Sequence, residues 1–274
     1  MLGKLFKYEW RSVTKLLLPV HGCILLFALL SCFYFSLGGG VEQLLSSKNS
    51  FVSILTGILI FALVVVIFSM AVFTYIYTGY HFYKNVFTDQ GYLTNTLPVT
   101  PGQILLAKGF AALLWMLIDV LVIGVSCIIL FASKDFFSNF GLFCTSMIEY
   151  MGQMPSFTIL LIFSLILMPI ELVVLLYFSI AIGNLAANHK VLASIGAYVG
   201  LYILQQIFGF IELMVVGFSG NGVFMNVNLP DTPSLTFQSF INPILLGSLV
   251  FSILMTIACW IGSKYIMSRK LNLQ

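Results

Sequence analysis

The sequence predicts an all-helical, polytopic membrane protein, and three observations carry this prediction. Hydrophobic residues make up 60% of the 274 residues and charged residues only 8%, about a third of the charged fraction of a typical soluble protein. Several apolar runs are long enough to cross ~30 Å of hydrocarbon as helices. The basic residues gather on one side of those runs. We therefore expect a single transmembrane domain over residues 1–274.

The N-terminal segment, residues 1–15, alternates apolar and basic residues at helical spacing. The apolar face comprises Leu2, Leu5, Phe6, Trp10 and Val13, and the basic face comprises Lys4, Lys7, Arg11 and Lys15. This pattern predicts an amphipathic helix in the membrane interface, with its basic side chains toward anionic lipid. Pro19 is a natural place for the chain to turn from the membrane surface into the first span.

Six membrane spans follow, separated by polar or glycine-rich breaks. We place the spans near residues 16–37, 53–80, 104–131, 156–183, 192–215 and 241–263. Residues 133–155 and 218–240 are expected to form loops between spans, and residues 184–190 a short break. The five cysteines lie mostly inside spans without paired spacing. That pattern is typical of packing rather than of a disulfide framework or a metal site.

Basic residues determine the expected orientation. Of the 12 Lys and Arg residues, all except Lys48 and Lys134 fall on the side that carries both termini. The positive-inside rule places this side in the cytoplasm. Lipid headgroups account for the net charge of +3, and no basic run is long enough to indicate a nucleic-acid partner.

The longest cytoplasmic connection, residues 81–101, is unusually apolar for a solvated linker. Thr88 or Asp89 is a candidate cap for a short helix that ends before Pro98. The next helix has a dense start signal. Thr100 is a candidate N-cap, Pro101 takes the first helical position, and Gln103 completes a Thr-x-x-Gln capping box.

The segment Asp89-Gln-Gly-Tyr-Leu-Thr-Asn-Thr-Leu-Pro-Val-Thr100 resembles the cytoplasmic segment of ATP-binding-cassette (ABC) exporter permeases of the type 2 superfamily, and Firmicutes-type peptide exporters in particular. The resemblance implies that this segment holds a coupling helix that docks in a groove of a separate ATPase subunit. The implied coupling residues are Asp89, Gln90, Gly91, Tyr92, Leu93, Thr94 and Asn95.

The resemblance also implies partners and a location. It implies two ATPase copies and a second permease, identical or paralogous, in a bacterial cytoplasmic membrane, with the first and fifth spans near the two-fold axis. The sequence has no Gly-x-x-x-x-Gly-Lys-Ser/Thr phosphate loop, so we expect ATP and Mg on the partner ATPase and no cofactor on this chain. By itself the chain is not expected to be an enzyme.

Two acids fall inside predicted spans. Asp119 lies near the middle of the third span, and Glu171 lies near the middle of the fourth, two residues after Pro169. No Lys or Arg lies at matching depth, so each carboxyl is expected to be protonated, hydrogen-bonded or facing water. Each is therefore either a packing group bonded to a neighbouring helix or part of a substrate pathway. Pro169 favours the pathway for Glu171, because a proline leaves a helical carbonyl without its donor.

The fifth span carries two different faces. One is a polar stripe at alternating steps of four and three, comprising Tyr198, Tyr202, Gln205, Gly209 and Glu212. Its members are candidates for a substrate pathway or for hydrogen-bonding glue between helices. On roughly the opposite face, Gly196 and Gly200 form a Gly-x-x-x-Gly pair that is suited to close helix packing.

Together these features indicate the permease subunit of an ABC exporter for amphipathic or hydrophobic peptides, such as antimicrobial or toxin-like peptides. A lipid or hydrophobic drug is the alternative cargo. A proton-coupled secondary transporter that uses Asp119 and Glu171 is a second class. It predicts internal similarity between the halves, which the sequence lacks, and leaves the Asp89 segment unexplained. A third class is a membrane sensor or scaffold that transports nothing.

The orientation can be checked by cysteine labelling in intact cells. In an otherwise cysteine-free chain, a cysteine at Asn49 should react with an impermeant thiol reagent, and one at Asn85 should not. Permeabilised cells supply the control in which both sides are reachable. Labelling of the Asn85 variant in intact cells would overturn the topology.

Overall fold

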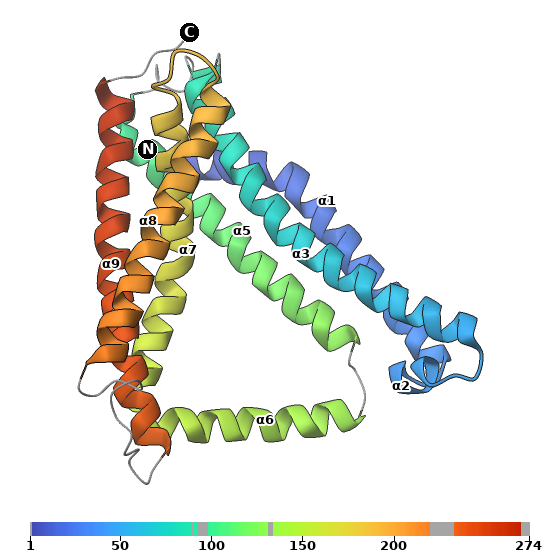
Figure 1. Ribbon diagram of the computed structural model, residues 1–274. Helices are drawn as coiled ribbons and strands as arrows, with labels where there is room; N and C mark the ends of the chain where they lie inside the picture. The colour runs from blue at the N-terminus through green and yellow to red at the C-terminus, as the bar shows by residue number, and fades with distance from the viewer. Residues whose placement is uncertain (1, 89, 92–97, 131–133, 220–232, 270–274) are drawn as a thin grey trace. The chain divides into compact units, whose positions relative to one another are not determined.

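The computed structural model describes the chain except for residues 1, 89, 92–97, 131–133, 220–232 and 270–274. Over the described residues the secondary structure is helical, without a strand. The elements are α1 (Leu2–Leu37), α2 (Val41–Leu45), α3 (Ser50–Phe87), α5 (Pro101–Leu130), α6 (Lys134–Gln153), α7 (Pro155–Gly183), α8 (Lys190–Phe218) and α9 (Pro233–Arg269) (Figure 1).

Six of these helices are long and apolar enough to cross a membrane, namely α1, α3, α5, α7, α8 and α9. This confirms the predicted number of spans, and the break at residues 184–190 falls between α7 and α8 as expected. Several of these helices extend beyond the predicted spans at one or both ends. For example, α3 covers Ser50–Phe87, whereas the apolar run alone predicted residues 53–80.

The expected loop at residues 133–155 is wrong, because α6 covers most of it. In its described part, Phe140, Phe143 and Met147 recur at helical spacing, separated by polar residues such as Asn139 and Ser146. Only one face of this helix is apolar. The mean hydropathy over a window of membrane length is therefore low, and such a window does not detect the helix. The same averaging hid the short helix α2 in the break after the first span.

The chain divides into two compact units. Unit 1 contains residues 1–81 and 110–142, and unit 2 contains residues 82–109 and 143–274. The last turns of α3 and the first turns of α5 therefore belong to unit 2. The two acids predicted inside the membrane fall in different units, Asp119 in unit 1 and Glu171 in unit 2.

In unit 1, α1 supplies one long buried stripe. Its buried residues follow steps of three and four, which places them on one face of the helix. They are Val13, Leu17, His21, Ile24, Ala28, Ser31 and Phe35. The apolar members pack against buried side chains of α3 and α5, including Leu63, Met70, Trp115 and Val122. A histidine therefore lies in the middle of an otherwise mostly apolar interface.

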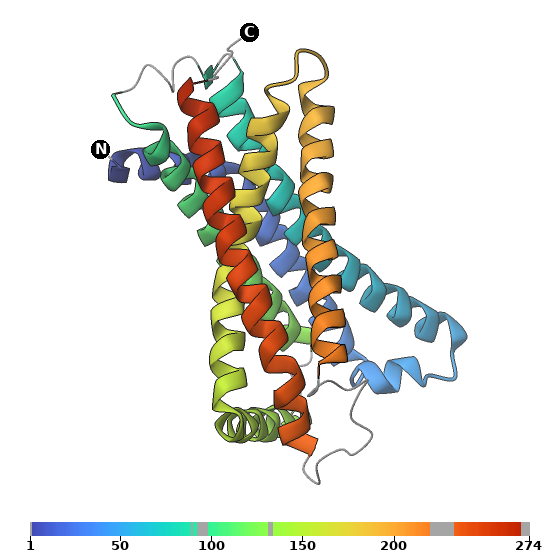
Figure 2. The same ribbon diagram turned by 60° about the vertical axis from the view of Figure 1, so that its left-hand side comes forward.

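The segment predicted as an interfacial helix and the first span form one continuous helix, α1. Pro19 lies inside α1. Figure 2 shows that the first turns of α1 run in a different direction from the rest of the helix. The N-terminal turns are held by polar contacts as well, since His81 near the end of α3 lies 3.1 Å from Ser12 Oγ and 3.5 Å from Glu9 Oε2.

In unit 2, α7, α8 and α9 pack side by side (Figure 2). Aromatic rings close one of these contacts, where Phe208 of α8 and Phe251 of α9 stack at 3.8 Å between centroids. The end of α3 joins α7 through Phe82 and Tyr177, which stack at 4.0 Å. Glycine allows a close approach where α7 ends, because a Cβ at Gly183 would overlap Ser194 of α8.

The predicted start of α5 is confirmed. The Thr100 N–H donates to Gln103 Oε1 at 3.1 Å, and the Gln103 N–H donates to Thr100 Oγ1 at 3.4 Å. Pro101 is the first residue of the helix, and Ile104 is buried. This reciprocal cap satisfies backbone donors that the first turn of a helix would otherwise leave unpaired. It fixes the backbone at the point where the connection between α3 and α5 ends.

Candidate functional site

Unit 1 contains a buried polar cluster of three side chains from three helices. His21 Nε2 of α1 lies 2.6 Å from Asp119 Oδ1 of α5, and Thr74 Oγ1 of α3 donates to the same oxygen at 3.0 Å. The exposed fractions are 4% for His21, 5% for Asp119 and 0% for Thr74. Asp119 therefore has a basic partner, which is the imidazole of His21 and not a Lys or Arg.

The hydrogen bonds of His21 determine how many protons the cluster holds. Its Nδ1 lies 2.7 Å from the Leu17 carbonyl oxygen, which can only accept, so Nδ1 carries a hydrogen. One further proton lies between Nε2 and Asp119 Oδ1, on either the imidazole or the carboxyl. The pair is net neutral in both arrangements. This neutrality removes most of the cost of placing two ionisable groups in an apolar interior.

Aromatic rings cover the cluster on one side. The centroid of the Trp115 ring lies 5.1 Å from that of His21, and Trp10 stacks on Trp115 at 5.3 Å. Trp10 was expected at headgroup depth on the apolar face of the N-terminal segment. In unit 1 it packs on α5, so the entry segment of the chain is tied to the neighbourhood of the buried acid.

Unit 2 contains the second of the two acids, at a junction of three helices. Glu171 of α7 accepts a hydrogen bond on Oε1 from Gln205 Nε2 of α8 at 2.6 Å. Its Oε2 accepts one from the Ser252 hydroxyl of α9. The three side chains are partly buried. Each carboxyl oxygen thus has a donor from a different neighbouring helix, which is the arrangement expected of interhelical glue.

The predicted polar stripe of α8 does not behave as one surface. Gln205 bonds Glu171, and the Glu212 carboxyl lies against Gly247 of α9, where an added Cβ would overlap it. Tyr202, in contrast, is 51% exposed, and Gly209 is also exposed, whereas Tyr198 is half-buried. The structure thus brings two stripe members to α7 and α9 and leaves the others at or near the surface.

The Gly-x-x-x-Gly face of α8 is exposed. A Cβ added at Gly196 or Gly200 meets no atom within 4 Å. The close packing predicted for this pair is therefore not made within the described part of the chain.

Of the seven predicted coupling residues, only Gln90 and Gly91 are described. Both are helical, and the Gly91 N–H donates to the Thr88 carbonyl at 2.7 Å. Asp89, Tyr92, Leu93, Thr94 and Asn95 lie outside the described residues. The segment leading into them is well held, because Phe82, Val86 and Phe87 near the end of α3 are all buried.

Sequence reasoning missed three members of these clusters, His21, Thr74 and Ser252. The sequence pattern does not connect His21 with Asp119, which lies 98 residues away. The signal that could have found it is the apolar stripe of α1, since His21 falls on the same helical face as Val13 and Ile24. A histidine on a buried stripe needs a polar partner. Among the described residues, no group of three or more His, Cys, Asp or Glu side chains could hold a metal ion.

A double-mutant cycle tests the His21–Asp119 pair. His21→Leu and Asp119→Leu should each destabilise the chain, and the double variant should lose less than their sum, with a coupling free energy of about 1–2 kcal/mol. The reason is that either single change strands a polar partner in an apolar interior. The measurement is reversible unfolding of the full chain in mixed micelles.

A matched cycle supplies the control for that pair. Cys23 is an exposed residue of the same helix, and Cys23→Leu combined with Asp119→Leu should be additive within about 0.5 kcal/mol. Additive effects of His21→Leu and Asp119→Leu would contradict the coupling assigned to the pair.

Comparisons with protein-family models, with curated proteins and with solved structures found no match for this chain. The two polar clusters, the six apolar helices and the capped connection between α3 and α5 are the features that bear on its function.

Proposed function

We propose that this chain is the transmembrane permease subunit of an ABC exporter. It works with two copies of a separate ATPase, which bind ATP and Mg, and with a second permease that is identical or paralogous. It resides in a bacterial cytoplasmic membrane with both termini in the cytoplasm. The cargo is an amphipathic or hydrophobic peptide of the antimicrobial or toxin-like kind, with a lipid or hydrophobic drug as the alternative cargo.

The observation that carries the proposal is the cytoplasmic connection between α3 and α5. Its sequence, Asp89 to Thr100, resembles the coupling segment of type 2 exporter permeases. Its two flanks support a mechanical role. On one side the Phe82 ring stacks on Tyr177 of α7 and Phe87 is buried, and on the other side the Thr100–Gln103 cap fixes the start of α5. A short segment between two rigid ends can transmit a displacement to both helices.

The cluster around Glu171 is a candidate binding site for the cargo. Three helices of unit 2 meet at this carboxyl through Gln205 and Ser252. A cationic group of a peptide can compete with these two neutral donors for the carboxylate, because hydrogen bonds between ionised groups are stronger than bonds to neutral donors. Release of Gln205 and Ser252 would then loosen α8 and α9 from α7.

The proton-coupled transporter is the second candidate, and one observation favours it. The shared proton of His21 and Asp119 is the kind of group that proton relays use. Both side chains are buried, however, and a relay needs water to reach the pair. Transport by reconstituted vesicles separates the two functions, because the exporter requires ATP and its ATPase, whereas the relay requires only a proton gradient.

Variants of the coupling segment test the first proposal. Tyr92→Ala or Leu93→Ala should leave insertion intact but weaken association with the ATPase by about tenfold or more, because each removes an apolar anchor from a small contact. Copurification of the untagged ATPase with the tagged chain gives the measurement. Leu45→Ala changes an exposed leucine in α2 and should have no effect. Unchanged copurification and transport in both variants would contradict the assignment of this segment as the coupling helix.

Substitutions at Glu171 test the cargo site. Glu171→Gln should fold normally, because its carbonyl can accept from Gln205 while its amide donates to the Ser252 hydroxyl. It should still reduce the export of cationic peptides, with a smaller effect on neutral cargo, because it removes the negative charge. Glu171→Leu should instead lose about 1–3 kcal/mol of stability by stranding both partners. Equal export of cationic cargo by the wild type and Glu171→Gln would leave Glu171 with a structural role alone.

A further inference from the structure

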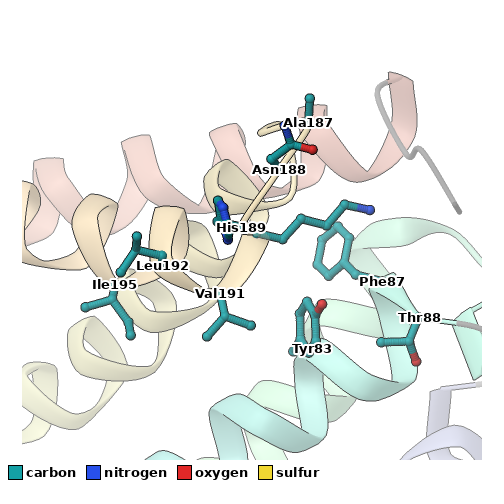
Figure 3. A pocket seen from close by; sticks show the side chains of 10 residues that line it. Tyr83, Phe87, Thr88, Ala187, Asn188, His189, Val191, Leu192 and Ile195 are labelled. Carbon is teal, nitrogen blue, oxygen red and sulfur yellow. The ribbon is translucent and has the colours of Figure 1, made fainter.

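A hollow of about 750 Å³ opens in unit 2 where α3 ends and α8 begins. Its lining residues come from the last turns of α3, from the loop after α7 and from the first turns of α8. They are Tyr83, Phe87, Thr88, Ala187, Asn188, His189, Lys190, Val191, Leu192 and Ile195. Figure 3 shows the rings of Tyr83 and Phe87 across the hollow from His189 and Val191.

The chemistry of the lining changes along the axis of α8. Asn188, His189 and Lys190 form a polar end that can donate hydrogen bonds, and Lys190 adds a positive charge. Val191, Leu192 and Ile195 continue from it as an apolar wall and are 58%, 68% and 56% exposed. None of the lining residues that the structure describes is acidic. The hollow thus has a cationic, hydrogen-bonding end and a hydrocarbon end.

A tight turn sets this arrangement. His189 has φ 56° and ψ 46°, the left-handed conformation, and it directly precedes the first residue of α8. This conformation is unfavourable for a residue with a side chain. It reverses the chain within the short loop after α7, so that the polar residues of the loop and the apolar first turn of α8 border the same hollow.

The spans predicted from the sequence put the hollow at the boundary between membrane and water. Its polar residues fall outside the predicted spans. The second predicted span ends at residue 80 on α3, and the fifth begins at residue 192 on α8. Leu192 and Ile195 fall inside the span of α8. Tyr83 has the amphipathic ring that is enriched at such boundaries. A ligand that bridges the hollow therefore has its polar part at headgroup depth and its apolar part in the hydrocarbon.

We propose that this hollow binds an anionic phospholipid of the adjacent leaflet. Lys190 supplies the counter-charge to the phosphate, and Asn188 and Tyr83 supply hydrogen-bond donors. One acyl chain lies along Val191, Leu192 and Ile195. The site is independent of the exporter proposal, but its wall includes Phe87 and Thr88, which lead directly into the coupling segment. A bound lipid would therefore contact the base of that segment.

The test is native mass spectrometry of the full chain in detergent, titrated with dioleoyl phosphatidylglycerol and, separately, with dioleoyl phosphatidylcholine. Phosphatidylglycerol should bind more tightly than the zwitterionic lipid. Lys190→Gln should weaken its binding about five- to tenfold, the effect of removing one basic contact. Lys84→Gln is the matched control, because Lys84 is a basic residue in the last turn of α3 that does not line the hollow. It should change binding less than about twofold.

A second variant probes the acyl wall and does not depend on the folding of the lysine variant. Leu192→Asn changes an exposed side chain, and it should weaken binding of the dioleoyl lipid but not of short-chain dihexanoyl phosphatidylglycerol. Equal binding of the two dioleoyl lipids, or equal losses from Lys190→Gln and Lys84→Gln, would overturn the proposal. Complete displacement of the lipid by millimolar glycerol phosphate would also overturn it, because the site would then recognise a free phosphate.

Discussion

Polar groups inside an apolar surrounding must find their hydrogen-bond partners within the protein, and this requirement shapes the rest of the chain. Hydrocarbon offers no replacement bond, so an unpaired buried group costs several kcal/mol. Unit 1 meets the requirement for Asp119 through His21 and Thr74, and unit 2 meets it for Glu171 through Gln205 and Ser252. In each case the partners come from different helices, so satisfying an acid also joins three helices.

The parts of the fold that depend on neighbouring residues could be predicted from the sequence. The six spans follow from apolar runs, and the start of α5 follows from Thr100, Pro101 and Gln103, whose contacts span only three residues. Glu171 and Gln205 were both recognised as candidates, because a polar residue in an apolar run stands out. The hydrogen bond between them depends on how α7 packs against α8. A local sequence pattern carries no information on that packing.

The missed features share a physical reason. His21 and Asp119 are 98 residues apart. To predict their pairing, one would have to know how α1 is rotated about its axis and how deep it lies relative to α5. The helix α6 was missed because a single apolar face is diluted in a long average. The Gly196–Gly200 face of α8 was recognised from spacing alone, and spacing cannot say whether its neighbour belongs to the same chain. The coupling prediction rests on Asp89 to Asn95, of which Gln90 and Gly91 are described as helical.

The single proton of the His21–Asp119 pair has an electrical consequence. A membrane potential does work of about 2.3 kcal/mol per 100 mV on an elementary charge that crosses the whole bilayer. Transfer between Nε2 and Oδ1 covers at most the 2.6 Å between those atoms, less than about a tenth of the ~30 Å hydrocarbon thickness. The corresponding work is about 0.2 kcal/mol per 100 mV at most. Proton transfer within the polar centre of unit 1 is thus nearly insensitive to voltage, and any steep voltage dependence of the protein must come from a charge elsewhere, such as an ionised Glu171.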